Sequence, residues 1–399
     1  GALARAPHRL SGTFRSGGQD HFYLEGQVAL AIPREDGTMH VHCSTQHPGE
    51  VQHMVARALG LQDHGVVVEC RRMGGGFGGK ETQMSLFACV AAIFARRTGR
   101  AVKLRLDRDD DMRSTGKRHA FLHGYDAGYD DEGRLLALDL TLASRCGFSA
   151  DLSGAINDRA VFHADNAYWL PDVAIHSFRC RTNTVSDTAF RGFGGPQGMF
   201  AIENVIDAVA RAAGLDPLDV RKANLYGKAE RNVTPYGMTV EDNIAPELVE
   251  HLERTSRYRE RRADLAQWNA SSPVIKRGLA LTPVKFGISF TASHYNQAGA
   301  LVHVYSDGTV LLNHGGTEMG QGLFTKVRQV VAHELGVAPD RVRVTASDTS
   351  KVPNASPTAA SSGSDLNGMA AREAARAIRA RLAIPAIPGA GELAIFTGA

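Results

Sequence analysis

Four loops rich in glycine or other small residues recur in this chain of 399 residues, each between a predicted strand and a predicted helix. They span residues 73–81, 189–198, 315–322 and 354–368 and read MGGGFGGKE, AFRGFGGPQG, GGTEMGQG and NASPTAASSGSDLNG. Because glycine lacks a Cβ atom, backbone N–H groups in such loops can approach a ligand closely, and a following helix favours an anion. Four loops of this kind favour one extended anionic ligand over four unrelated turns.

The periodicity between the loops predicts an α+β fold of mixed sheets and helices. Alternating apolar residues predict strands, and apolar residues three or four apart predict helices. Strands are expected at 21–32, 39–44, 65–73, 101–108, 120–143, 301–306, 309–315 and 341–347. Helices are expected at 1–10, 47–60, 82–97, 199–210, 216–227, 247–269, 323–336 and 369–383. We expect two subdomains of one larger domain, at 1–235 and from 278 to 399, joined by a helical connection at 236–277.

Composition excludes several classes of protein. Lys and Arg total 45 against 42 Asp and Glu, and this near-balance argues against a dedicated nucleic-acid surface. The longest apolar run, residues 86–95, is too short to cross a bilayer, and the first residues lack a signal-peptide core. The five cysteines contain no CxxC pair, which excludes an iron–sulfur cluster held by this chain alone and favours the cytoplasm.

The loop at 73–81 also matches two nucleotide-binding patterns. Gly74, Gly76 and Gly79 satisfy GxGxxG, and residues 74–80 satisfy GxxxxGK. A phosphate-binding loop needs Ser or Thr after the lysine, however, and Glu81 at that position would repel a triphosphate. The chain also lacks HExxH and a Ser–His–acid order typical of hydrolases. A metal, if present, should therefore be held mainly by a cofactor and not by protein side chains.

Longer blocks of the sequence point to one protein family. Several blocks are similar to the corresponding blocks of the xanthine dehydrogenase family, namely residues 17–26 (GGQDHFYLEG), 44–48 (STQHP), 71–81 (RRMGGGFGGKE), 107–119, 181–198 (RTNTVSDTAFRGFGGPQG), 283–291 (PVKFGISFT), 296–322 and 350–368. The resemblance runs from about residue 15 to 383. It implies the molybdenum-cofactor-binding subunit or domain, truncated at both ends, with molybdenum on the dithiolene of molybdopterin or its cytosine dinucleotide form.

The resemblance also implies roles for individual residues. Gln46 matches the glutamine beside the apical oxygen of the metal, and the other cofactor-binding positions are Phe77, Gly78, Arg191, Gly320, Gln321, Ala359, Ala360, Ser361 and Ser362. No protein side chain is expected to ligate the metal directly. Gln46, Glu81 and Arg159 are the candidate catalytic residues.

The resemblance also implies a pocket that binds a purine. Glu81 and Arg159 match the two polar residues that hold the purine in the family. Phe193 and Phe290 match the two aromatic rings between which the purine lies, with Thr291 beside them. Two aromatic faces suit a flat substrate, whereas a carboxylate and a guanidinium can pair with its polar edges. The guanidinium could also stabilise charge on a ring carbonyl.

The implied activity is hydroxylation of hypoxanthine and xanthine toward urate, in purine catabolism. In the family, a metal-bound hydroxide (Mo–OH) attacks the ring carbon, hydride passes to a sulfido ligand (Mo=S), and electrons leave through 2Fe-2S centres and FAD on other domains or subunits. The expected partners are the purine and an iron–sulfur/FAD subunit in a hetero-oligomer, without nucleic acid or membrane. The alternatives are an aldehyde oxidase-type hydroxylase, or a cofactor-binding fragment inactive without the general-base glutamate that the family carries beyond the equivalent of Ala399.

Overall fold

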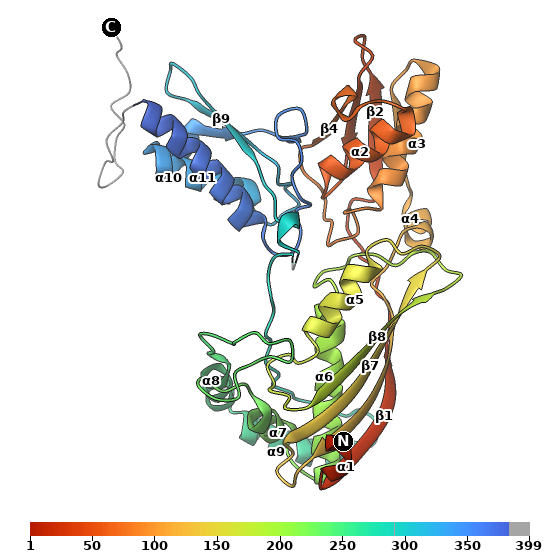
Figure 1. Ribbon diagram of the computed structural model, residues 1–399, viewed down its shortest axis with the longest axis vertical. Coiled ribbons are helices and arrows are strands. Elements are labelled where there is room, and N and C mark those ends of the chain that lie inside the picture. Colours follow the sequence, from red (N-terminus) through yellow and green to blue (C-terminus); the bar gives the residue numbers. More distant parts are fainter. Residues whose placement is uncertain (291, 383–399) are drawn as a thin grey trace. The chain divides into compact units, whose positions relative to one another are not determined.

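The structure, a computed structural model, describes residues 1–290 and 292–382, and these form two compact units (Figure 1). Unit 1 comprises 1–19, 119–184 and 192–287, whereas unit 2 comprises 20–118, 185–191 and the chain from 288 onward. The units therefore alternate along the chain, while the subdomains expected from the sequence are continuous ranges that remain a prediction. The expected α+β class is confirmed.

Unit 1 contains a four-stranded sheet in the order β1-β6-β7-β8. The β7–β8 pair is parallel and the other two pairs are antiparallel. Its strands are β1 (His8–Ser16), β6 (Phe121–Tyr129), β7 (Leu135–Gly147) and β8 (Val173–Arg181). Its helices are α1 (Ala2–Arg5), α5 (Ser153–Phe162), α6 (Gly195–Ala213), α7 (Pro217–Asn224), α8 (Ala245–Thr255) and α9 (Tyr258–Ser271).

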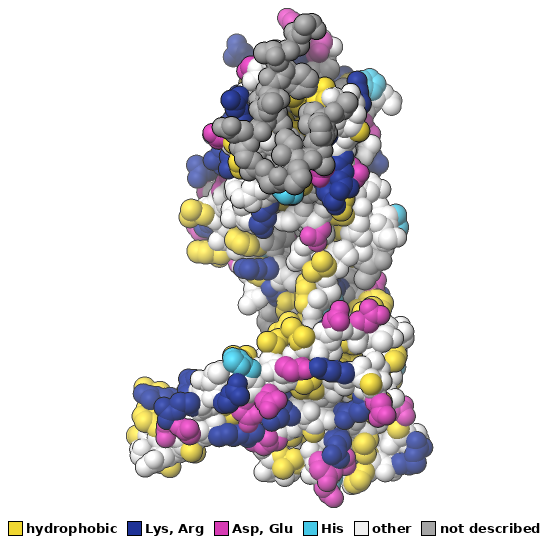
Figure 2. Space-filling view, turned by 90° about the vertical axis from the view of Figure 1, so that its left-hand side faces the viewer, with side chains coloured by type: hydrophobic (Ala, Val, Ile, Leu, Met, Phe, Trp, Pro, Cys, Tyr) yellow, Lys and Arg dark blue, Asp and Glu magenta, His cyan; other side chains and the backbone are white. Residues whose placement is uncertain are grey.

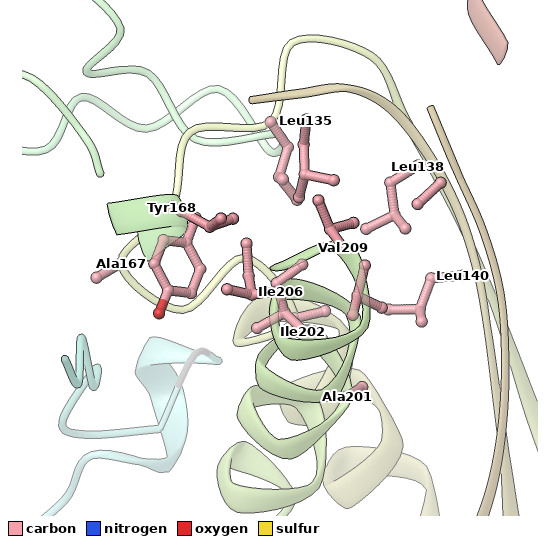
Figure 3. Packing of buried hydrophobic residues seen from close by; sticks show 14 of the residues in the cluster. Leu135, Leu138, Leu140, Ala167, Tyr168, Ala201, Ile202, Ile206 and Val209 are labelled. Atoms are coloured by element: carbon pink, nitrogen blue, oxygen red, sulfur yellow. The ribbon is translucent and has the colours of Figure 1, made fainter. Parts of the chain in front are cut away.

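The core of unit 1 lies between the sheet and α6 (Figure 3). Ile202, Ile206 and Val209 recur three or four residues apart on one face of α6, and all are fully buried. They pack with Leu138 and Leu140, which alternate inward along β7. On the surface of unit 1, basic and acidic side chains are interspersed in the lower part of Figure 2.

Unit 2 contains two sheets. The five-stranded sheet has the order β12-β4-β3-β2-β5, and the three-stranded sheet has the order β11-β10-β9. The first is formed by β2 (Val28–Pro33), β3 (Met39–Cys43), β4 (Val66–Cys70), β5 (Val102–Arg105) and β12 (Ser347–Asp348), and the second by β9 (Ala300–Val304), β10 (Val310–His314) and β11 (Val342–Val344). The α-helices of unit 2 are α2 (Pro48–Leu59), α3 (Met84–Thr98), α4 (Arg108–Ser114), α10 (Leu323–Leu335) and α11 (Gly363–Arg381). Short 3-10 turns occupy Asp63–Gly65, Ser293–Tyr295 and Pro339–Arg341.

Each sheet of unit 2 buries one face under two helices. Helices α2 and α3 cover one face of the five-stranded sheet, and α10 and α11 pack with the three-stranded sheet (Figure 1). Along β3, Met39, Val41 and Cys43 face this core, so His40 and His42 belong to the opposite face. Gly60 ends α2 in the left-handed conformation (φ 64°), as the sequence predicts for a glycine after a helix.

Two local predictions need correction. The helix expected at 1–10 is only α1, and the chain turns at Ala6 into β1, whose residues pair with β6 along their whole length. Between residues 144 and 188 no element was expected beyond the end of β7, yet α5 and β8 lie there. Among the described residues, no helix is both long and apolar enough to cross a membrane.

Candidate functional site

Gln46 occupies the turn between β3 and α2 and joins two of the small-residue loops of unit 2. Its side-chain Oε1 accepts a hydrogen bond from the N–H of Gly78 (2.8 Å), and its Nε2 donates to the carbonyl of Thr358 (3.1 Å). Its backbone N–H donates to Lys80 and its carbonyl accepts from Thr358, both at 2.9 Å. Because Gln46 is only 3% exposed, these bonds are shielded from water and fix the side chain.

The third loop of unit 2 is tied to the same framework. The N–H of Thr317 donates to Oγ1 of Thr358 (2.8 Å), and the N–H of Met73 donates to the carbonyl of Glu318 (2.9 Å). Loops 73–81, 315–322 and 354–362 are therefore connected to one another and to Gln46. The expectation that these loops share one site is consistent with this arrangement.

Gly78 is required where its loop meets residues 189–191. Its φ of +99° is accessible mainly to glycine, and an added Cβ atom would lie 2.7 Å from the carbonyl oxygen of Ala189. Beside it, the carbonyl of Phe77 accepts a hydrogen bond from the N–H of Arg191 (2.8 Å). Arg118, which the sequence did not single out, donates to the carbonyl of Arg191 (2.9 Å) and so supports the same segment.

Backbone strain coincides with several predicted positions. Phe77, Phe193, Ala360 and Ser361 all have positive φ, between 51° and 59°, although none is glycine. Such conformations cost free energy and persist where surrounding structure imposes them, often at ligand sites. Among the described residues these four are a third of the twelve non-glycine residues with positive φ, so the strain is not confined to the predicted positions.

The N-terminus of α10 already holds a carboxylate. Glu318 accepts hydrogen bonds from the N–H groups of Gly320 (2.9 Å), Gly322 (3.0 Å) and Phe324 (3.0 Å). Burial alone would raise the pKa of Glu318, but these N–H groups lower it. The side chain of Gln321 is also used within the loop, because it accepts from Met319 (2.7 Å) and donates to Thr317 (2.9 Å). The backbone N–H of Gly320, one of the predicted cofactor-binding positions, therefore makes its hydrogen bond within the loop in this structure.

Lys80 does not have the role that a nucleotide-binding loop would give it. Its side chain is fully buried, and Nζ donates to the carbonyl (2.7 Å) and to the carboxylate (3.1 Å) of Glu25. Glu25 also accepts from the N–H of Gly74 (3.0 Å), so the pair fastens the glycine loop to the preceding segment. Glu81 follows immediately and is 5% exposed, as a carboxylate positioned by this loop.

Arg159 lies in unit 1 on α5, within an arrangement that fixes its orientation. Its guanidinium donates to the carbonyl of Gly287 and lies 4.8 Å from the ring centre of Phe286. The N–H of Gly287 donates to Nε2 of His163 (3.1 Å), so Nδ1 of this ring donates to the carbonyl of Arg159 (2.8 Å). Burial lowers the pKa of Arg159 and lowers that of His163 to about 4. His163 and Phe286 were not predicted, although Phe286 lies in the block PVKFGISFT.

Two glycines of the loop at 189–198 are explained by helix packing. An added Cβ atom on Gly194 would meet the carbonyl of Ile156, and one on Gly198 would meet the carbonyl of Ala160. These glycines let α6 approach α5 closely within unit 1, which is a structural role and needs no ligand. Phe193 is half-buried beside them in the same loop.

The other predicted aromatic residue, Phe290, belongs to unit 2. It exchanges hydrogen bonds with Asn296, which accepts from the N–H of Phe290 (3.0 Å) and donates to its carbonyl (2.9 Å). The neighbouring Ser289 donates its N–H to Ala360 (2.8 Å), which joins this segment to the loop at 354–362. Thr291 lies outside the described residues. Among the predicted substrate residues, unit 2 thus contains Glu81 and Phe290, and unit 1 contains Arg159 and Phe193.

Comparison with known families decides the ligand class. Residues 1–225 match a family model described as a molybdopterin cofactor-binding domain, and residues 251–388 match a second model with the same description. The chain belongs to the molybdopterin cofactor-binding domain family. Its two matched regions cover all ten cofactor-binding positions that the sequence predicted.

The relatives of this chain include several xanthine dehydrogenases. It is 46% identical to the xanthine dehydrogenase of Drosophila subobscura over 382 residues, 96% of this chain and 28% of that protein. The xanthine dehydrogenase/oxidase of Gallus gallus is 46% identical over 376 residues, 94% of this chain and 28% of that protein. The resemblance to the xanthine dehydrogenase family is confirmed, and the chain spans just over a quarter of the length of these relatives.

Solved structures share the fold. The aldehyde oxidoreductase of Desulfovibrio gigas matches with a TM-score of 0.79 at 26% identity, over 94% of this chain and 41% of that one. Quinoline 2-oxidoreductase of Pseudomonas putida 86 matches with a TM-score of 0.84 at 24% identity, over 96% of this chain and 50% of that one.

The residues present in unit 2 fit a pterin cofactor. Cβ atoms added to Gly320 and Gly322 would meet nothing within 4 Å, so open space adjoins the loop before α10. Ala359, Ala360 and Ser361 offer only small side chains and are partly exposed or exposed. A bulky planar group can therefore approach the backbone of both loops.

Proposed function

We propose that this chain holds a molybdenum–pterin cofactor through the unit 2 loops that meet at Gln46. The observation that carries the proposal is the buried set of hydrogen bonds joining Gln46 to Gly78 and Thr358. Phe77, Gly78, Arg191, Gly320, Gln321 and residues 359–362 are the positions proposed to hold the cofactor. When bound, the cofactor supplies the redox centre for hydroxylating a carbon of the substrate.

We further propose that the complete protein hydroxylates hypoxanthine and xanthine toward urate. The support is the identity to enzymes named xanthine dehydrogenase, together with the polar residues at positions 81 and 159. Glu81 is a buried carboxylate that can accept hydrogen bonds from ring N–H groups of a purine. Because a hydrogen-bonding residue left without its partner is costly, such a residue discriminates against substrates that lack the N–H group.

Arg159 is proposed to recognise purine oxygen. Its guanidinium is oriented by Gly287 and Phe286, and burial in unit 1 strengthens its interaction with an anionic or carbonyl oxygen. It can therefore stabilise negative charge that develops on a ring carbonyl. Phe193, Phe290 and Thr291 remain proposed as apolar and neighbouring contacts of the ring.

The remaining parts of the activity are proposed for segments other than this chain. These are 2Fe-2S and FAD centres on partner domains or subunits of a hetero-oligomer, in a cytoplasmic enzyme of purine catabolism. An aldehyde-type hydroxylase is the second candidate, favoured by the structural match to the Desulfovibrio gigas aldehyde oxidoreductase. In the complete protein, Glu81→Gln separates the two, because it should lower kcat/KM for xanthine about 10- to 100-fold and leave aldehyde oxidation nearly unchanged.

Cofactor content tests the first proposal directly. The chain is purified from a host that makes molybdopterin, and molybdenum and pterin per chain are measured by elemental mass spectrometry and by fluorescence after oxidation. We expect near-stoichiometric cofactor in the wild-type chain and a large loss in Gln46→Ala. Gln52→Ala is the matched control, because Gln52 is also buried and donates twice, to Asp63 (3.0 Å) and Val66 (2.7 Å), away from the loops. Equal cofactor content in the two variants, or none in the wild-type chain, would contradict the proposal.

A further inference from the structure

A second cluster of metal-binding side chains lies on the five-stranded sheet, on the face opposite α2 and α3. His40 and His42 are two residues apart on β3 and so project from the same face, and Glu69 on β4 is the direct neighbour of His42 in the parallel register. Nε2 of His40 lies 3.7 Å from Oε2 of Glu69, and Nδ1 of His42 lies 3.9 Å from Oε1. One ligand atom from each residue lies within 4.8 Å of the other two.

We propose that His40, His42 and Glu69 bind a Zn²⁺ ion. Zinc takes imidazole nitrogen and carboxylate oxygen at about 2.0–2.2 Å, and tetrahedral ligand atoms are then about 3.4 Å apart. The two histidine–glutamate separations, 3.7 and 3.9 Å, are about 0.3–0.5 Å longer than this, and the 4.8 Å limit that encloses all three ligand atoms is about 1.4 Å longer. Rotation of partly exposed side chains, which are 19%, 39% and 27% exposed, can close that gap.

Acidic side chains lie beside the ring of His40, and negative charge there favours a bound cation. Glu69 and Asp348, which are cross-strand neighbours in the β4–β12 register, add negative charge beside it. Two imidazoles and one carboxylate form a ligand set found in zinc and non-haem iron sites.

Arg34 competes with a zinc ion for the side chain of His40. Its Nη2 lies 2.9 Å from Nδ1 of His40 and must donate to it, because a guanidinium has no acceptor. If Nε2 of His40 binds zinc, Nδ1 carries the proton and Arg34 has to leave. Arg34 is exposed, so it can move into solvent, and its removal should strengthen zinc binding.

The fourth zinc position has room for water or a small anion. His42 and Glu69 also line a cavity of about 250 Å³, together with Leu30, Arg71 and Arg72. Three protein ligands with an open position are typical of reactive zinc sites, and two arginines would favour an anionic fourth ligand. The inference concerns this cluster alone and does not depend on the molybdenum–pterin proposal.

The test measures zinc affinity of the full chain in competition with a chromogenic chelator, after metal removal. We expect one tight Zn²⁺ per chain. His40→Ala, His42→Ala and Glu69→Gln should each weaken it at least about 100-fold, since loss of an outer partner alone typically costs 10- to 100-fold. Arg34→Gln should tighten binding. His176→Ala is the matched control, because His176 also faces a carboxylate, Asp139 at 3.4 Å, on a different sheet.

A spectroscopic probe identifies the ligands. Co²⁺ bound in place of zinc should give visible d–d absorption without the thiolate charge-transfer band that Cys43 or Cys70 would produce. Circular dichroism of each variant verifies that it is folded. Unchanged affinity in the three ligand variants, or a thiolate band, would overturn the proposal. Cofactor content is measured separately, so failure here leaves the molybdenum–pterin proposal standing.

Discussion

Acid should destabilise unit 2 through His314, and the size of the effect can be worked out from its surroundings. The ring is 2% exposed, lies edge-on to Phe324 at 5.1 Å, and neither nitrogen has a hydrogen-bond partner among the described residues. Burial lowers its pKa to about 4, against a weaker opposing effect of Glu318. The unfolded chain has the ordinary value near 6.5. Below that value the unfolded state binds a proton that the folded state does not, so stability falls as the pH falls from about 6.5 to about 4.

The magnitude follows from the two pKa values. At about pH 5.5 the unfolded imidazole is mostly protonated and the folded one is not, which costs about 1.4 kcal/mol relative to neutral pH. By about pH 4 the loss approaches 3 kcal/mol. Between these values the slope should average about 1.1 kcal/mol per pH unit, because it approaches one proton near pH 5 and falls as the folded ring begins to protonate near pH 4.

Urea unfolding at a series of pH values measures this slope in the wild type and in His314→Leu. Because neither ring nitrogen has a hydrogen-bond partner among the described residues, leucine should cost little stability at neutral pH and should remove about one proton from the slope. Gln62→Leu is the control, since Gln62 is exposed and carries no titrating proton. If His314→Leu leaves the wild-type slope unchanged, the buried neutral state assigned to this ring is wrong.

Three further changes test the loop framework by the same unfolding measurement. Gly78→Ala should lower the free energy of unfolding by about 2–5 kcal/mol, because it adds positive-φ strain and a contact with the carbonyl of Ala189; a loss below 1 kcal/mol would mean that the loop relaxes freely. Glu318→Gln should cost about 1–2 kcal/mol, because an amide replaces the carboxylate that accepts three N–H groups at the start of α10, and full stability would show that water can replace it. Lys80→Met should lower the free energy of unfolding by about 1–3 kcal/mol, which is less than the loss expected when one partner of a fully buried ion pair is removed. The reason is that Glu25 is 37% exposed, so water can hydrate its carboxylate. A larger loss would indicate that Glu25 is buried in solution.

Local sequence signals predicted much of the fold. The helix at 47–60 was recognised by its apolar spacing and by Gly60, and the structure places it at Pro48–Leu59 with Gly60 as its left-handed cap. By contrast α5, which carries Arg159, has little apolar periodicity of its own. It forms because Ile156 and Ala160 pack under α6, and Gly194 and Gly198 permit the close approach. That determinant lies about 40 residues further along the chain, where no local pattern can show it.

The site was predicted from its family blocks, and the structure adds what the blocks could not show. Gln46 and Gly78 were both among the predicted positions, but their direct hydrogen bond, between residues 32 apart in the sequence, was not predicted. Lys80 was considered as a phosphate ligand because it follows a glycine loop, whereas its partner Glu25 is 55 residues earlier in the sequence. Glycines were read as ligand-binding in all four loops, and in the loop at 189–198 two of them serve helix packing.

The alternation of the two units along the chain has a consequence for synthesis. Strand β1 ends at Ser16 but pairs with β6, which begins at Phe121. At a translation rate of roughly 5–20 residues per second, β1 waits for its partner for about 5–20 s, longer than most small domains need to fold. During that interval its hydrogen-bonding edge is unpaired, as the whole first segment of unit 2 is synthesised. No single cut in the chain would separate the two units, because the segments that build one alternate with the segments that build the other.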